Sequence, residues 1–238
     1  MNAHELLAQY EATGDEEAFV GAKTLYEQAL AESPDDADLH MNYGYLLECH
    51  ARNQLRQAVT HYERASELNP SGIKAHFHLI GARAGLREPE IPIARYEQRL
   101  ASAPGDLDSY RLLAAAYLAG HQYEQARRVI EAGLVLSPDN AQLIENRGDV
   151  RAGTGDPEGA LADWRRSHEL DPETLSSVYS SAFLLEREGR LEEAMDAWQT
   201  IIDWSEARGC VRDTVWAKQE LERLRRKMAN ETNEPPTS

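Results

Sequence analysis

Residues 107–140 decide the fold, and they read LDSYRLLAAAYLAGHQYEQARRVIEAGLVLSPDN. Apolar residues recur every three or four positions, the spacing that places side chains on one face of a helix: Tyr110, Leu113, Ala114 and Tyr117. Gly120 interrupts this pattern, a second helical face follows, and Pro138 ends it because proline cannot continue a helix. One such helix pair cannot bury its apolar face alone, so the stretch predicts neighbours of the same kind.

Three markers repeat along the chain with one period. Proline recurs at Pro34, Pro70, Pro104, Pro138 and Pro172. A bulky residue recurs at Tyr26, Tyr62, Tyr96, Ile130, Trp164 and Trp198, and a third series runs Ala22, Ala58, Pro92, Ala126, Ala160 and Ala194. The spacing is 34 residues except for one gap of 36 in each series, which places a two-residue insertion in the second unit.

On these residues the chain resembles the tetratricopeptide repeat family, whose 34-residue unit is a helix–turn–helix. The matching residues in the fourth unit are Tyr110, Leu113, Ala114, Tyr117, Ala126, Ile130, Gly133 and Pro138. The resemblance implies an all-α, right-handed superhelical solenoid over residues 3–208. Its six repeats are 3–36, 37–72, 73–106, 107–140, 141–174 and 175–208.

Beyond the repeats we expect a capping helix over residues 210–230 and a disordered tail over 231–238. The helix is indicated by apolar residues spaced by three and four that would cover the exposed flank of the last repeat: Cys210, Thr214, Ala217, Leu221, Leu224 and Met228. A coiled-coil dimer is the alternative, but sustained pairing needs at least three or four heptads. The tail is polar and contains paired prolines.

Two units depart from the repeat pattern. We expect the two extra residues of the second unit to lie in a turn around His50–Gln54, since loops tolerate insertions. In the third unit, Pro92 and Arg99 replace small residues, which predicts a local irregularity there. In the fifth unit, Arg147 and Arg151 stand where the family buries apolar side chains. Either their stems lie along the core with the heads in water, which we favour, or they pair with acids such as Glu145 or Asp149.

Composition limits the classes of function. A net charge of −16 argues against nucleic acid as a partner and fits a neutral or basic protein partner. No basic region followed by an apolar run opens the chain, and no stretch approaches the roughly 20 apolar residues of a membrane span. Cys49 and Cys210 lie about five repeats apart, so we expect reduced thiols in a cytoplasmic protein.

Catalysis and cofactors are not indicated. Cys49 and His50 are adjacent, so on a helix their side chains diverge and cannot act as a nucleophile and its base. His40 and His76 share one repeat position and can approach each other, but a structural zinc site typically needs four ligands. The run from Gly153 to Gly159 looks superficially like a phosphate loop but lacks its lysine and preceding strand. We therefore interpret it as the turn between two helices, and the histidines as packing residues.

Peptide binding is the function that the resemblance implies, because in this family the first helices line a concave groove. Carried over by position, the candidate lining is Met41, Asn42, Tyr45, Lys74, Phe77, His78, Arg111, Asn146, Tyr179 and Phe183. Asparagine can bond a peptide backbone, lysine and arginine can hold a carboxylate, and aromatic rings supply apolar contact. The competing interpretation is that any exposed helix face carries such residues.

One subtype of the family clamps the acidic C-terminus of heat-shock chaperones with five polar residues. Only Asn42 and Lys74 match here, while Leu7, Glu11 and His78 replace the other three, so that specificity is not expected. We therefore expect a non-catalytic protein- or peptide-binding adaptor. The alternative is a self-assembling scaffold that forms homo-oligomers through its groove or its oppositely charged ends. Residues 1–40 carry a net −9 and residues 210–230 a net +3.

Overall fold

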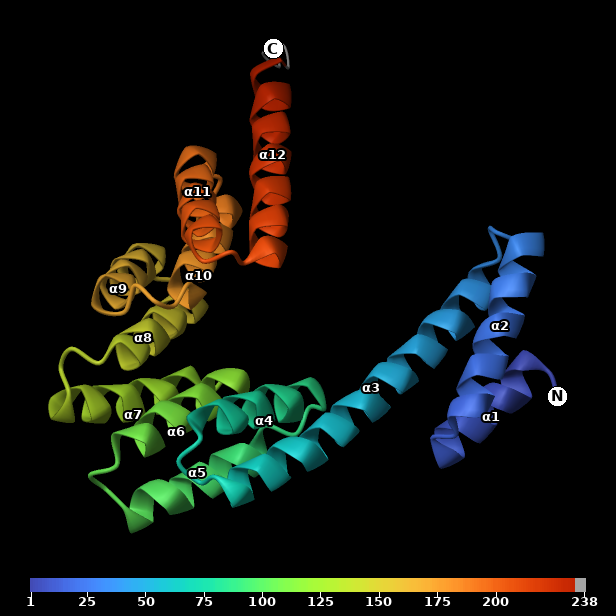
Figure 1. Ribbon diagram of the computed structural model, residues 1–238, viewed down its shortest axis with the longest axis horizontal. Coiled ribbons are helices and arrows are strands. Elements are labelled where there is room, and N and C mark those ends of the chain that lie inside the picture. The colour runs from blue at the N-terminus through green and yellow to red at the C-terminus, as the bar shows by residue number, and fades with distance from the viewer. Residues whose placement is uncertain (234–238) are drawn as a thin grey trace. The chain divides into compact units, whose positions relative to one another are not determined.

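The computed structural model describes residues 1–233, and all the regular elements within that range are helices (Figure 1). The first four are α1 (Ala3–Thr13), α2 (Glu16–Glu32), α3 (Ala37–Leu68) and α4 (Ile73–Gly85). The next four are α5 (Glu90–Ser102), α6 (Leu107–Ala119), α7 (Tyr123–Leu136) and α8 (Ala141–Thr154). The last four are α9 (Pro157–Leu170), α10 (Ser176–Arg187), α11 (Leu191–Ala207) and α12 (Val211–Asn233). The expected all-α repeat of helix pairs is confirmed. The chain forms two compact units, which meet in sequence between Pro92 and Ile93.

Short polar residues begin most first helices of the repeats. The Asp106 carboxylate accepts the backbone N–H of Asp108 at the start of α6, and the Asn140 side chain accepts that of Leu143 at the start of α8. These bonds satisfy N–H groups that the first turn of a helix leaves without partners. Within a pair, Gly14 and Gly155 end their helices in the left-handed conformation that glycine adopts without strain.

The expected turn at His50–Gln54 does not form. Instead, α3 runs without interruption through 32 residues and joins both helices of the second unit into one (Figure 1). The physical reason is local, because other units break their pairs at a glycine, as at Gly120 and Gly189. Residues 50–54 read HARNQ, with no glycine or proline, and alanine, arginine and glutamine favour helix. The inserted residues therefore extend a helix and do not lengthen a loop.

The two halves of α3 pack in separate clusters. The first half lies against α1 and α2 in a cluster of buried side chains: Leu7, Tyr10, Ala18, Phe19, Ala22, Tyr26, Leu46 and Cys49. The second half lies against α4 through Val59, Leu79 and Ala82. Near the junction of the halves, the His50 ring stacks on Phe19 at 3.8 Å between centroids, and its Nδ1 lies 3.0 Å from the Tyr10 hydroxyl. The α1–α2 pair is thereby fixed to the first half of α3.

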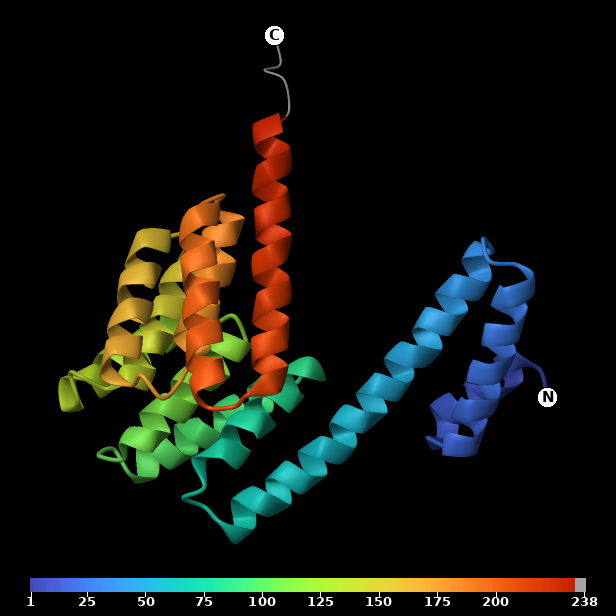
Figure 2. The same cartoon turned by 45° about the horizontal axis from the view of Figure 1, so that its top comes forward.

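The unit that starts at Ile93 contains the regular repeats and the larger core. Helices α6 with α7, α8 with α9 and α10 with α11 form pairs, and α12 packs along α11 (Figure 2). The core at its C-terminal end buries Trp198, Ile201 and Leu224 almost completely. Pro92 lies in the first turn of α5, where its missing N–H costs little. Arg99, near the end of the same helix, forms an ion pair with Asp106 at 3.0 Å.

The predicted stripe of α12 faces the core, since Ala217, Leu221 and Leu224 are buried and Met228 packs against them. The helix begins at Val211 and continues to Asn233, three residues past the expected end. The rest of the predicted tail, residues 234–238, lies outside the described residues. In the described part of the chain, no helix has both the length and the apolar composition that crossing a bilayer requires.

Candidate functional site

The predicted lining residues fall into two groups, one in each compact unit. In residues 1–92, Met41 and Tyr45 are exposed on the first half of α3, and the Tyr45 hydroxyl donates to the Glu11 carboxylate. Asn42 is half-buried on the same segment. Phe77 and His78 lie on α4, where His78 stacks on Tyr62 at 5.2 Å, and Lys74 is exposed near the start of that helix. Because α3 is continuous, these residues form two separate groups, one on the first half of α3 and one on α4.

The second group lies on the first helices α6, α8 and α10. Arg111 donates to Asp108 at 2.9 Å, but its Nε has no hydrogen-bond partner among the described residues. Asn146 is only 4% exposed, and its Oδ1 accepts a 3.3 Å bond from Gln142. The Nδ2 of Asn146 likewise finds no acceptor within residues 1–233. Both of these donor atoms are buried, so neither is open to a ligand in this conformation.

Aromatic rings gather where α10 meets α12. Tyr179 stacks on Trp216 with centroids 5.5 Å apart, and Phe183 meets Trp198 edge-on at 5.4 Å. Phe183 and Trp216 are still 48% and 39% exposed. Tyr179, Trp216, Arg212 and Asp213 line a cleft of about 480 Å³. This arrangement presents flat apolar surface beside one cation and one carboxylate, which suits recognition of an amphipathic segment.

Trp216 was absent from the predicted lining, because it lies off the packing stripe of α12. The available signal was its residue type, since a large aromatic ring on the polar face of a highly charged helix is unusual. The structure thus places Tyr179 and Phe183 each against Trp216, a side chain from the capping helix.

Two carboxyl groups on α8 are buried at positions that match lining residues of other repeats. Glu145 matches Arg111 and Tyr179, and Asp149 matches Phe183. Burial raises the pKa of Glu145 to about 7; the charge of Asp149 adds to this rise and a hydrogen bond with Ser176 opposes it. Burial also raises the pKa of Asp149 to about 6, opposed by a 3.0 Å bond from the Trp164 indole N–H. The fifth repeat therefore adds acidic groups to this face, which the sequence interpretation missed.

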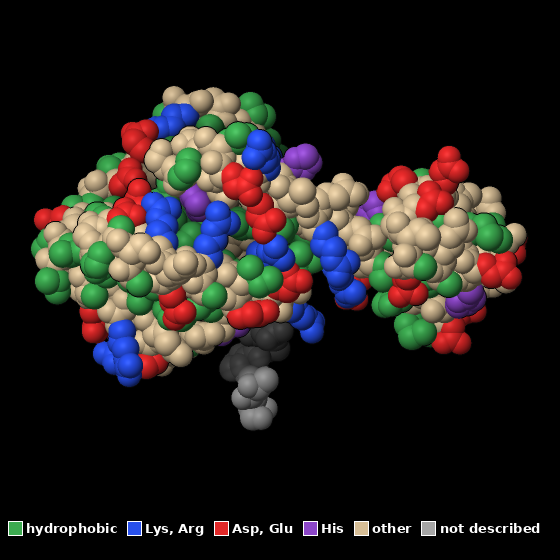
Figure 3. All heavy atoms as spheres, turned by 90° about the horizontal axis from the view of Figure 1, so that it is seen from below, with side chains coloured by type: hydrophobic (Ala, Val, Ile, Leu, Met, Phe, Trp, Pro, Cys, Tyr) green, Lys and Arg blue, Asp and Glu red, His purple; other side chains and the backbone are tan. Residues whose placement is uncertain are grey.

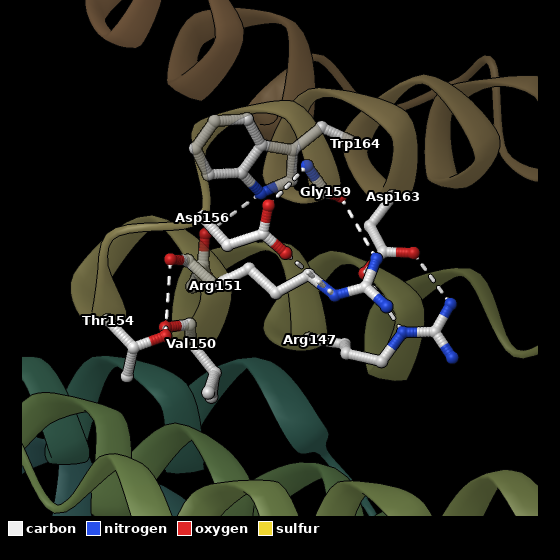
Figure 4. Close-up of polar contacts among 9 residues, drawn as sticks. Arg147, Val150, Arg151, Thr154, Asp156, Gly159, Asp163 and Trp164 are labelled. Carbon is white, nitrogen blue, oxygen red and sulfur yellow. Dashed lines mark hydrogen bonds and ion pairs between the residues drawn. The ribbon is translucent and has the colours of Figure 1, made fainter.

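Arg147 and Arg151 behave differently from both expectations. Each guanidinium pairs with Asp163 on α9, at 2.6 Å for Arg147 and 2.8 Å for Arg151 (Figure 4). Their side chains are about one third exposed, whereas Asp163 is 5% exposed. The acceptor is therefore a buried carboxylate of the facing helix, and neither Glu145 nor Asp149 pairs with these arginines. One carboxylate with two arginines replaces an apolar contact between the helices of this pair.

The run from Gly153 to Gly159 forms the expected turn between two helices. Gly155 ends α8, and the Asp156 carboxylate accepts the backbone N–H of Gly159 at 2.9 Å to cap α9 (Figure 4). Arg151 also donates to the Gly159 carbonyl at 3.1 Å, which ties the end of α8 to the first turn of α9.

The histidines that share a repeat position have structural partners. His40 Nε2 donates to the Pro34 carbonyl at 2.8 Å, and His76 Nε2 to the Pro70 carbonyl at 3.2 Å. Tyr110 makes the same contact with Pro104. The carbonyl of the proline that ends one repeat thus accepts a hydrogen bond from a side chain on the first helix of the next repeat. No group of three His, Cys, Asp or Glu side chains that could hold a metal ion occurs in the part of the chain that the structure describes. Cys49 and Cys210 are free thiols.

Comparison with known proteins agrees with the geometry of the helix pairs. Residues 111–173 match the family described as tetratricopeptide repeat. This segment of the chain therefore consists of tetratricopeptide repeats. The matched segment includes α8, α9 and the arginine–aspartate contact between them.

Individual relatives are similar over part of this chain. Cellulose synthase operon protein C of Komagataeibacter xylinus is 34% identical over 65 residues, which are 27% of this chain and 5% of the relative. Superkiller complex protein 3 of Homo sapiens is 24% identical over 143 residues, which are 59% of this chain and 9% of the relative. The chain therefore spans less than a tenth of either curated relative.

A solved structure shares the fold. A thermophilic tetratricopeptide repeat protein of Thermus thermophilus superposes with a TM-score of 0.56 at 24% identity. The superposition covers 74% of this chain and 94% of the other. At this identity the likeness concerns the fold alone.

Proposed function

We propose that the protein is a non-catalytic cytoplasmic adaptor that binds a peptide segment of a partner protein over the aromatic cluster of α10 and α12. The coarser part of this statement follows from the fold, since tetratricopeptide repeat proteins generally serve as adaptors or scaffolds in protein–protein interactions and are generally non-catalytic. Two free thiols fit a reducing compartment.

One observation supports the position of the site. Phe183 and Trp216 keep 48% and 39% of their surface exposed although both belong to a packed cluster of rings. Rigid aromatic side chains lose little conformational entropy when a partner covers them, and they are enriched among the residues that dominate binding.

Charge supports a neutral or basic peptide. Asp213 lies at the cleft itself. The whole chain carries a net charge of −16, so an acidic peptide would meet repulsion on approach. We therefore infer that a bound segment places an apolar residue on the rings and a basic residue toward Asp213.

The test starts with selection of peptides from a random displayed library on the full-length chain. Binding of a selected peptide is then measured by fluorescence anisotropy. We expect Phe183→Ala and Trp216→Ala each to weaken binding by about tenfold or more, the effect of removing an aromatic anchor. Val135→Ala is the matched control, since Val135 is 81% exposed on α7, a second helix. Equal binding by all three variants would contradict the assignment.

The predicted lining in residues 1–92 needs its own variants. Asn42→Ala, Lys74→Ala and Asn146→Ala are compared in the same assay, or in a crosslinked pull-down of the partner. Weaker binding by Asn146→Ala alone would restrict the binding surface to the second compact unit. Weaker binding by Asn42→Ala or Lys74→Ala would extend the binding surface to residues 1–92.

Self-assembly through oppositely charged ends is the second candidate. Acidic side chains predominate over α1 and α2 on the face drawn in Figure 3, whereas residues 210–230 have a net charge of +3. Several of the cations are already paired within the chain, as Arg223 is with Glu186 at 2.6 Å and Lys218 with Glu206 at 2.6 Å. Light scattering across a salt series discriminates, because charge-driven growth in mass disappears at high ionic strength.

A further inference from the structure

The regular repeats show how the two helices of one unit contact each other. Gly148 on α8 lies so close to α9 that an added Cβ would come 2.6 Å from Nε1 of Trp164 and 3.2 Å from the Ala160 carbonyl oxygen. Small residues at the matching positions are completely buried: Ala114, Ala126, Ala182 and Ala194. The contact between first and second helix therefore depends on a small residue in each helix, with a bulky residue beside them.

The second unit carries the same residue types but makes no such contact within the chain. Gly44 matches Gly148, Ala58 matches Ala160 and Tyr62 matches Trp164. All three lie on α3, where 18 residues separate Gly44 from Tyr62, a distance of about 27 Å along a helix. A Cβ on Gly44 would meet nothing within 4 Å, and neighbouring Leu47 is 42% exposed. The contact residues are present, but Gly44 cannot reach Ala58 and Tyr62 because all three lie on one uninterrupted helix.

The two-residue insertion places both contact surfaces on one side of α3. Twelve residues separate the paired small positions in other units, as from Gly148 to Ala160, which is about 120° around a helix. In α3 the separation from Gly44 to Ala58 is fourteen residues, two heptads, which returns to nearly the same side. Leu47, Ala51 and Ala65 share this side and are exposed. One face thus contains the first-helix contact residue Gly44 at an exposed end. At its other end are the second-helix contact residues Ala58 and Tyr62, which α4 leaves half-buried.

We propose that this face of α3 is covered by α3 of a second copy, in an antiparallel dimer that exchanges helices. A two-fold axis near Ala51 places each Gly44 on the Ala58 and Tyr62 side chains of the other copy, because the two ends of the face are complementary to each other. The first half of α3 from one copy then pairs with the second half of α3 from the other copy. Helices α1 and α2 of the first copy and α4 of the second pack on this pair. The repeat contact seen between α8 and α9 is rebuilt from two chains.

Charge along α3 agrees with this orientation. The first half contains Asp38 and Glu48 and no lysine or arginine, whereas Arg52, Arg56 and Arg64 lie in the second half with two glutamates. Antiparallel pairing brings the acidic half of one copy beside the more basic half of the other, and parallel pairing would place like halves together. The inference does not depend on the proposed peptide surface, which lies in the other compact unit.

The first experiment measures the mass of the full-length chain by light scattering coupled to size exclusion. We expect a dimer of twice 26.7 kDa. Gly44→Trp should convert it to a monomer with unchanged helical circular dichroism, because the site is open within one chain. Thr60→Trp is the matched control and should leave the dimer intact, since Thr60 is exposed about 160° around α3 from Gly44. A dimer that survives Gly44→Trp would overturn the proposal.

The second experiment separates exchange between copies from closure within one chain. Cys49 and Cys210 are replaced by alanine, and chains with Gly44→Cys are mixed with differently tagged chains that carry Ala58→Cys. Because a disulfide needs Cα atoms within about 7 Å, a disulfide between the two tagged chains supports the dimer. In a chain with both substitutions, the uninterrupted helix keeps the two sulfurs about 20 Å apart. A monomer with an internal disulfide would show that the helix pair closes on itself, and a monomer without any disulfide would show that the face stays bare; both results overturn the proposal.

Discussion

At the scale of single residues, the fifth repeat replaces apolar packing with buried charge. Asp163 accepts from both Arg147 and Arg151, and the Trp164 indole donates to Asp149 (Figure 4). Such groups are costly to bury unless partners satisfy them. Asp163 is well satisfied, whereas Glu145 has a long 3.4 Å bond from Gln142 and a hydrogen bond with Ser176. The hydrogen bonds of Glu145 therefore offset the cost of its burial less well than those of Asp163 do.

This imbalance predicts a dependence of stability on pH. The pKa of Glu145 is raised to about 7 in the folded chain, so the folded state favours the protonated form. Ionisation above that pH costs stability, and the cost disappears as pH falls toward the ordinary glutamate value. We expect Glu145→Gln to raise the free energy of unfolding by on the order of 3 kcal/mol at pH 8 and by less than about 1 kcal/mol at pH 5. Urea denaturation at the two pH values measures this difference.

The control for the pH prediction is Glu169→Gln, an exposed residue of α9. Its effect should be small and equal at both pH values, because an exposed carboxylate gains little from its surroundings. If Glu145→Gln shifts stability equally at pH 5 and pH 8, the burial of Glu145 is not the source of the effect.

At the scale of elements, helix pairs depend on the closeness of their two helices. Gly148 allows α8 to approach Trp164, whose indole N–H is already held by Asp149 and cannot easily move away. Gly81 on α4 has the same residue type in an open position, with nothing within 4 Å of an added Cβ. The two glycines thus separate the effect of packing from that of helix propensity.

We expect Gly148→Ala to destabilise the chain by about 1–3 kcal/mol through overpacking. Gly81→Ala should stabilise it by about 0.5–1 kcal/mol, because alanine restricts the unfolded chain and favours helix. The urea midpoints of both variants, compared with the parent chain, check the two signs. A stabilising Gly148→Ala would mean that α8 and α9 do not approach as closely as the structure shows.

Much of the element pattern was predictable from the sequence, because prolines, glycines and small residues mark it directly. The 34-residue period and Gly120 indicated the correct pairs, and the stripe of Ala217, Leu221 and Leu224 predicted the buried side of α12. The turn at His50–Gln54 was predicted wrongly, because the repeat pattern was followed where no local residue breaks the helix. Asp163 and Trp216 were missed because their roles depend on side chains of other helices, which periodicity does not reveal.

At the scale of the whole molecule, the two compact units differ in how their cores are built. Residues 1–92 distribute their buried side chains over two small clusters along α3. The second unit has a large cluster at its C-terminal end that includes Trp164 and Trp198, and it buries further side chains such as Leu112 and Ile130. Repeat arrays are stabilised by contacts between neighbours, so a region with fewer buried contacts can unfold by itself.

This difference predicts two unfolding transitions at low protein concentration. All four tryptophans follow residue 92, so their fluorescence reports on the second unit only, whereas circular dichroism reports on every helix. We expect the helical signal to begin to fall at a lower urea concentration than the fluorescence changes. Leu79→Ala should move only the first transition, since Leu79 is buried against α3. Coincident curves for the two probes would show that the chain unfolds as a single cooperative unit.

The uninterrupted course of α3 also has a kinetic consequence. A dimer that shares helices through α3 cannot separate by diffusion alone, because each copy must first unpack a helix pair from the other. Unpacking crosses the barrier of local unfolding, so the ratio of dimer to monomer reflects the concentration at which the chains folded and persists after dilution. The oligomeric state of a sample would then depend on the conditions under which its chains folded and not only on those under which it is measured.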